Sequence, residues 1–156
     1  MRKRSRYKPK PVLLDPLGFV VESAKPLKDH DSYVLDWRLK NNLAFQALLR
    51  AEASVGDLNT LVAATNIVEA LLVVCKLQDQ DGTVARSAVA LMDICDRANK
   101  GNGTATKAPE QQALRDMMVL HDELMENVSV KQFEEGLTYA RKEIRAGRAT
   151  KLKEVK

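Results

Sequence analysis

The stretch of residues 54–77 constrains the fold of this chain more than any other. Ser54, followed by Asp57 three residues later, is a variant of the capping box that begins a helix. Apolar side chains then cover most of the helix circumference: Leu58, Leu61, Val62, Ile67, Val68, Leu71, Leu72 and Cys75. A helix that is apolar nearly all round must be buried among other elements. We therefore expect this helix at the centre of a helical bundle.

Four further stretches carry the start signals of helices. Short polar side chains accept hydrogen bonds from the first N–H groups of a helix, and proline fits its first turn. The four expected helices run from Asp31 or Ser32 to about Ala51, from about Thr83 to Asn99, from about Pro109, and from Ser129. Five helices joined by short connections predict an all-α fold, a compact bundle of antiparallel neighbours.

The first of these helices has an alternative interpretation. Residues 33–40 alternate in the way that is typical of a strand. Tyr33, Leu35, Trp37 and Leu39 alternate with Val34, Asp36, Arg38 and Lys40. From Leu39 onward the leucines have helical spacing, and no partner strand is evident elsewhere. We expect a helix here, with a strand as the alternative.

Helical spacing also predicts which faces of the last three helices point inward. In the helix over 83–99 the expected inner residues are Val84, Ala88, Leu91, Met92 and Cys95, with Arg86, Asp93 and Arg97 outward. In the next helix they are Leu114, Met117, Met118, His121, Leu124 and Met125. In the last helix they are Val130, Phe133, Leu137, Ala140 and Ile144, a narrow seam that places this helix on the outside.

Three parts are expected along the chain: an extended basic N-terminal arm over residues 1–28, the helical bundle over 29–146, and a basic C-terminal tail over 147–156. The arm contains Pro9, Pro11, Pro16 and Pro26, which fix φ and remove backbone donors, so no helix is expected there. Its apolar stretches at 12–14 and 17–21 can dock on the bundle.

The chain has the sequence features of a soluble cytoplasmic protein. Its basic opening is followed by prolines rather than by the apolar region of a signal peptide. We find no apolar run of the roughly 18 residues needed to span a bilayer, so no membrane contact is expected. Scarce aromatic residues, 4% of the chain, also favour helix over sheet.

Positive charge is concentrated at the two ends of the chain. Residues 1–11 hold six basic residues and no acid, and the stretch from Arg145 onward holds five basic residues against Glu154 alone. Between them, residues 12–144 carry 14 basic and 20 acidic residues, a net charge of −6. A cluster of like charges repels itself and is typical of an interaction tail.

Cations clustered in this way match what binds a polyanion. Each Lys or Arg can neutralise a phosphate and release a counterion, while a tyrosine can stack on an unpaired base. The candidate nucleic-acid-binding residues are Arg2, Lys3, Arg4, Arg6, Tyr7, Lys8, Lys10, Arg145, Arg148, Lys151 and Lys153. Two simpler interpretations stay open: a solubilising tail, and an arm that packs across the acidic body of its own chain or of a neighbour.

The sequence offers little for catalysis, a metal or a cofactor, and we expect no enzyme. His121 beside Asp122 could be a general base, but a histidine on an apolar stripe is more often a core residue with a hydrogen bond. Cys75 and Cys95 lie in apolar runs and have the pattern of small buried hydrophobes rather than of a disulfide or metal ligands. Gly101 and Gly103 before Lys107 lack the strand and the Lys-Ser/Thr pair of a phosphate loop.

The chain resembles uncharacterised small helical proteins carried by bacteriophages and prophages. The resemblance lies in the opening Met-Arg-Lys-Arg-Ser-Arg-Tyr-Lys-Pro-Lys-Pro, and in Leu48-Leu49-Arg50, Asp57, Leu58, Asn59, Thr60, Leu61, Asn66, Glu69, Ala70 and Leu71. It implies an accessory role in the cytoplasm of a bacterial host cell. It transfers no activity and no functional residue.

Three functional hypotheses follow. The first is a non-enzymatic phage-type accessory protein that binds DNA or RNA through its two basic ends, which would form one positive surface if both emerged at the same end of the bundle. The second is an inhibitor or adaptor that binds a host protein complex through its acidic body. The third is a homo-oligomer, a structural component in which the arm of one chain lies on the body of the next.

Overall fold

The structure is a computed structural model that describes residues 23–29 and 31–149 of the 156-residue chain. Within these residues the chain forms a short 3-10 helix, η1 (Leu27–Asp29), and five α-helices: α2 (Asp31–Leu49), α3 (Val55–Val74), α4 (Thr83–Asn99), α5 (Ala108–Asn127) and α6 (Val130–Arg145). The predicted all-α bundle is therefore confirmed. Residues 33–40 are helical, so the strand alternative is wrong.

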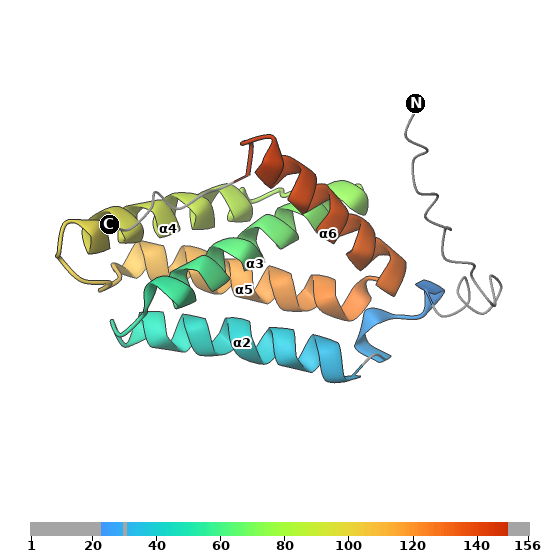
Figure 1. Ribbon diagram of the computed structural model, residues 1–156, viewed down its shortest axis with the longest axis horizontal. Helices are drawn as coiled ribbons and strands as arrows, with labels where there is room; N and C mark the ends of the chain where they lie inside the picture. The colour runs from blue at the N-terminus through green and yellow to red at the C-terminus, as the bar shows by residue number, and fades with distance from the viewer. Residues whose placement is uncertain (1–22, 30, 150–156) are drawn as a thin grey trace, which may run out of the picture.

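Helix α3 lies at the centre, as its apolar circumference predicts. It contacts each of the other four α-helices, and Figure 1 shows it running diagonally across the molecule, from the end of α2 to the start of α4, and crossing α5 in this view. Among the described residues it is the one helix long and apolar enough to cross a membrane. Its burial by the four surrounding helices accounts for this composition, because every covered face needs apolar side chains.

Local capping sets where the helices begin. At α3 the Ser54 hydroxyl accepts from the Asp57 N–H at 3.2 Å while the Asp57 carboxylate accepts from the Ser54 N–H at 2.8 Å, a complete capping box. At α4 the cap comes from Asp79, whose carboxylate accepts from the N–H groups of Thr83 and Val84 at 2.8 and 2.9 Å. The negative charge of Asp79 also suits the positive end of the helix dipole.

The inner face of α4 differs from the predicted one. Met92 was expected to point inward but is 47% exposed, whereas Ala90 and Ile94 are buried. Arg97, expected to point outward, binds Glu110 of α5 through two hydrogen bonds of 2.7 Å. The reason is that α4 packs on α3 and α5 together, so its buried face is rotated toward the groove between them. The expected inner residues of α5 are all buried.

The polypeptide just before α2 is attached to the turn between α5 and α6. Pro26 forms an isolated antiparallel bridge with Ser129, and the Leu27 N–H donates to the Val128 carbonyl at 2.9 Å. The Leu27 side chain is 3% exposed and belongs to the core. The bundle therefore includes Pro26 and Leu27, which were predicted from the sequence to belong to the N-terminal arm over residues 1–28.

Helix α6 lies close against α3 because of a glycine. A Cβ added at Gly136 would lie 2.8 Å from the Leu71 Cδ2 atom, and Leu71 is fully buried. The missing side chain lets the two backbones approach, as small residues do where helices cross closely. Gly136 therefore allows α6 to lie close against α3 at this point.

We predict that Gly136→Val lowers the free energy of unfolding by about 1–3 kcal/mol, because the added side chain overpacks the buried Leu71. Denaturant unfolding followed by circular dichroism measures the effect. Gly56→Val is the control, since the nearest atom to a Cβ there is the Ser54 Oγ at 3.5 Å. An equal loss of stability in both variants would contradict the close approach at Gly136.

Candidate nucleic-acid interface

Most of the predicted binding residues lie outside the described residues. These are Arg2, Lys3, Arg4, Arg6, Tyr7, Lys8, Lys10, Lys151 and Lys153. The structure places Arg145 in the last turn of α6 and Arg148 in the turn that follows it. Both are exposed, so the described part of the predicted interface is the C-terminal end of α6.

The end of α6 carries more positive charge than Arg145 and Arg148, the two residues predicted there from the sequence. Arg141 and Lys142 are exposed and lie one turn before Arg145, and none of these three cations forms an ion pair within the described residues. Arg141 and Arg145 are four residues apart and so share a face of the helix. This four-residue spacing was visible in the sequence and could have identified Arg141. The cations also suit the negative end of the helix dipole.

Arg148 differs from these cations because it is held by a carboxylate. Its Nε donates to Glu143 Oε2 at 2.6 Å and its Nη2 donates to Glu143 Oε1 at 2.7 Å. These hydrogen bonds lower the pKa of Glu143 below its usual value. A phosphate bound by Arg148 would have to displace this carboxylate, whereas Arg141, Lys142 and Arg145 have no ion-pair partner among the described residues to displace.

The two basic ends of the chain leave the bundle at different places. The N-terminal polypeptide reaches the bundle at the start of α6, where the Val130 N–H donates to the Lys25 carbonyl at 3.1 Å. Residues 146–149 continue the chain from the other end of the same helix (Figure 1). A 16-residue helix is roughly 24 Å long, which is the separation between the two departure points along α6.

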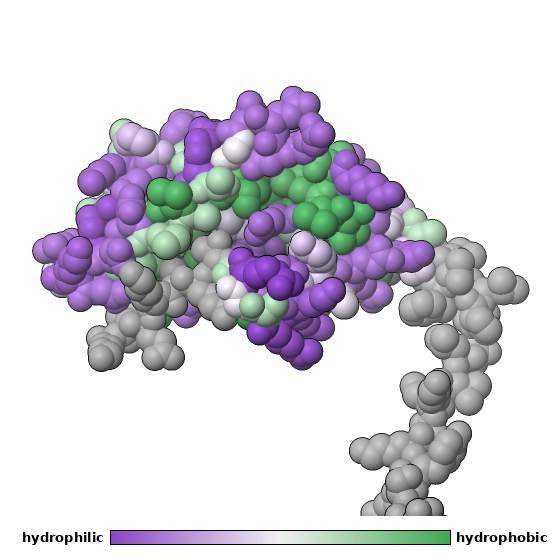
Figure 2. Space-filling model, turned by 90° about the horizontal axis from the view of Figure 1, so that it is seen from above, coloured by the Kyte–Doolittle hydropathy of each residue, from purple (hydrophilic) through white to green (hydrophobic). Residues whose placement is uncertain are grey.

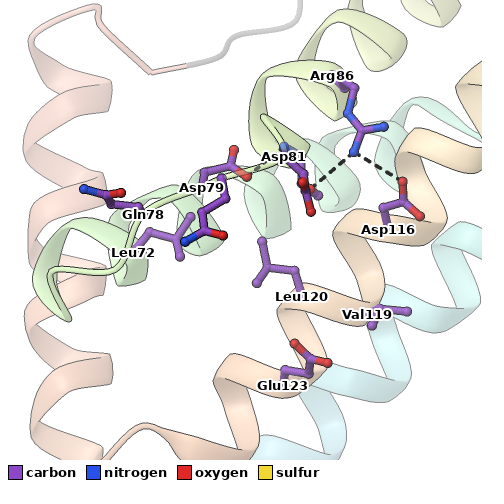
Figure 3. A pocket seen from close by; sticks show the side chains of 11 residues that line it. Leu72, Gln78, Asp79, Asp81, Arg86, Asp116, Val119, Leu120 and Glu123 are labelled. Carbon is purple, nitrogen blue, oxygen red and sulfur yellow. Dashed lines mark hydrogen bonds and ion pairs between the residues drawn. The ribbon is translucent and has the colours of Figure 1, made fainter.

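A hollow on the α3–α4–α5 side of the molecule is acidic. It has a volume of about 500 Å³, and Figure 3 shows Asp79, Asp81, Asp116 and Glu123 around it with a single arginine, Arg86. Arg86 Nη2 lies 3.4 Å from Asp116 Oδ2. Negative charge is therefore in excess in this hollow, in contrast to the end of α6.

A second surface feature is apolar. Figure 2 shows apolar side chains gathered in the middle of the face seen from above, within a polar surround. Val73 of α3 and Leu77 just after the helix are each about half exposed. Both line a hollow of about 410 Å³ that also includes Val84 at the start of α4.

His121 is part of a buried polar network between α2 and α5. The ring is fully buried, with Nε2 at 3.0 Å from Asn41 Nδ2 and Nδ1 at 3.1 Å from Asp122 Oδ1. Because an amide nitrogen donates, Nε2 accepts and the Nδ1–H group donates to Asp122. Arg38 binds the same carboxylate and also Glu126, each at 3.3 Å. With both ring nitrogens bonded and no contact with solvent, His121 has the geometry of a core histidine.

The cysteines and the acidic residues form no metal centre in the part of the chain that the structure describes. No group of three or more His, Cys, Asp or Glu side chains there could hold a metal ion. Both cysteines are free; Cys95 is buried and Cys75 is half-buried. Burial raises the pKa of Cys95 to about 11, so its thiol stays protonated at neutral pH.

Comparison of the chain with protein-family models, with curated proteins and with solved structures finds no match.

We predict that acid destabilises the bundle through His121. Burial lowers the pKa of the ring, and this effect outweighs the opposing effect of Asp122. The folded state therefore binds a proton less readily than the unfolded state, whose histidine pKa is near 6.5. The contribution of His121 to stability is complete above that pH and declines as the pH falls below it.

Urea unfolding at pH 7.5 and at pH 5.5 measures this decline. In His121→Gln, which keeps hydrogen-bonding groups toward Asn41 and Asp122, the difference in unfolding free energy between the two pH values should become smaller. An unchanged difference would show that other groups cause the acid sensitivity.

Proposed function

We propose that the protein binds nucleic acid without sequence preference, through its basic ends and the basic end of α6. The observation that carries the proposal is the exposure of Arg141, Lys142 and Arg145 at the point where the chain continues toward Lys151 and Lys153. Phosphate contacts from Lys and Arg give affinity that depends on salt and little on sequence. The role is that of a non-enzymatic accessory protein of the bacteriophage type, in the cytoplasm of a bacterial host cell.

The distribution of charge supports this assignment. The hollow around Asp79, Asp81, Asp116 and Glu123 would repel a nucleic acid, so a polyanion is directed toward the end of α6. The opening decapeptide supplies further cations on a long tether, and Tyr7 adds a ring on which a base can stack. Two basic regions on one molecule raise the affinity beyond that of either alone, provided that both reach the same strand.

An inhibitor or adaptor of a host protein complex is the second candidate function, and the acidic hollow favours it. A basic patch on a partner protein could bind there by charge complementarity. In that case the arm variants described below would keep their partner, and the partner would survive nuclease treatment of the lysate.

We predict that changing Arg2, Lys3, Arg4 and Arg6 together to Ala abolishes retention on DNA or RNA at low salt. In a fluorescence anisotropy titration, the slope of log K against log salt should fall in magnitude by roughly 3–4, about one for each lost phosphate contact. Single-stranded DNA, single-stranded RNA and duplex DNA, each of about 20 residues and of scrambled sequence, are the probes. An unchanged slope would reject the arm as a binding element.

We predict a separate loss for the triple change of Arg141, Lys142 and Arg145 to Ala, with a reduction of the slope by roughly 2–3. The matched control removes three other exposed cations, Arg50, Lys100 and Arg115. Both triple variants have the same net charge, so the net charge alone cannot account for a difference between them. Equal losses in the two variants would show that the end of α6 is not a specific contact.

A further inference from the structure

Helix α2 is apolar on two opposite faces. Its inner face packs on the bundle through Ala44, Phe45 and Leu48, all of which are buried. On the opposite side of the helix, three leucines follow one another at four-residue spacing, and Leu35, Leu39 and Leu43 are 66%, 55% and 60% exposed. Residues four apart lie on one face, so these leucines form a continuous apolar ridge, which we call the leucine ridge.

A ridge of this kind is unusual on a helix that faces solvent. Such a helix normally presents charged or polar residues there, and clustered exposed apolar residues mark an interaction site. The ridge also explains why residues 33–40 have a strand-like alternation. Leu35 and Leu39 belong to the outer face, whereas Trp37 lies on the inner side with its ring 5.6 Å from that of Phe133.

Charged residues of opposite sign border one edge of the leucine ridge. Asp36 and Lys40 lie four residues apart along the edge that faces the start of α3, and neither is ion-paired within the described ranges. A hollow of about 550 Å³ lies along this edge, between Leu39, Leu43 and the first turn of α3. An incoming side chain has space there.

We propose that the leucine ridge is the contact surface for a second copy of this chain, with the two α2 helices antiparallel about a two-fold axis at Leu39. In this arrangement Leu39 meets Leu39 of the second copy, and Leu35 meets Leu43 of the second copy. A two-fold contact must be self-complementary, and a ridge of identical side chains centred on one residue meets that condition.

The charged edge matches the same arrangement. An antiparallel two-fold pairing brings each edge of α2 against the same edge of the other copy, with the direction reversed. With a rise of 1.5 Å per residue, Asp36 and Lys40 of the second copy then lie roughly 3 Å apart along the helix axis. Two symmetric contacts of opposite charge result, and they outnumber the single contact between the two Lys40 side chains, which lie an equal distance apart along the axis. A parallel two-fold pairing would instead bring this edge against the opposite edge of the other copy, so Asp36 and Lys40 of the two copies would not meet.

The leucines and the charged edge of one copy match those of a second copy in this arrangement. No observation supports a different partner in the same way. Three leucines on each side make a small interface, so we expect weak, concentration-dependent association. A dimer would carry two sets of basic ends, which would strengthen binding to a long polyanion. The dimer itself does not depend on the proposed nucleic-acid binding.

Sedimentation velocity of the full-length protein, freed of nucleic acid, tests the proposal over roughly 10 µM to 1 mM, where small interfaces associate. We expect a monomer–dimer equilibrium that Leu39→Glu weakens at least tenfold, because two carboxylates then face each other across the axis. Val119→Glu on α5 is the matched control, since Val119 is 59% exposed and Leu39 is 55% exposed. Circular dichroism checks that both variants are folded.

A charge exchange tests the orientation of the two helices. Asp36→Lys should weaken the dimer roughly two- to tenfold, and Asp36→Lys combined with Lys40→Asp should restore it, because opposite charges then meet again. Failure of the double variant to recover would overturn the antiparallel pairing. A wild-type protein that stays monomeric at all concentrations would overturn the proposal; the ridge would then be covered by residues 12–21 of the same chain or serve a different protein. A dimer that survives Leu39→Glu would overturn it as well.

Discussion

Burial of most of the surface of α3 among the other four α-helices is the constraint on which the rest of the structure depends. A helix whose apolar side chains cover most of its circumference is unstable in water, so the other four α-helices pack against it. Each of them then has one face committed to α3. The close contact between Gly136 and Leu71 shows how tightly this arrangement is packed, because a single missing side chain allows α6 to lie across the central helix.

Polar contacts between the surrounding helices determine how each is rotated. Asn41, His121, Asp122 and Arg38 join α2 to α5, and Arg97 with Glu110 joins α4 to α5. Hydrogen bonds of buried groups are costly to leave unmade, so these pairs favour one orientation over others that would bury a similar apolar area. Because the network with His121 fixes the inner side of α2, it also fixes the outward direction of the leucine ridge.

The two functional surfaces that we propose lie on different helices and use different physics. The proposed binding at the end of α6 would rely on charge and decline with salt, whereas the proposed contact through the leucine ridge would rely on apolar burial, to which salt matters little. The acidic hollow between α3, α4 and α5 would keep a polyanion away from the body of the protein. The two proposed properties would therefore be separable by mutation.

The sequence by itself determined that the fold is an all-α bundle, that α3 is its central helix, and that cations gather at the two chain ends. These properties depend on local periodicity and capping, which residues such as Ser54, Asp57 and Ser129 encode within a few positions. Tertiary structure alone decided that Met92 faces solvent, that Arg97 is bound by Glu110, and that Leu35, Leu39 and Leu43 lie outward. The reason is that a helix with more than one apolar face does not specify which face is buried; that choice belongs to the helices that pack against it.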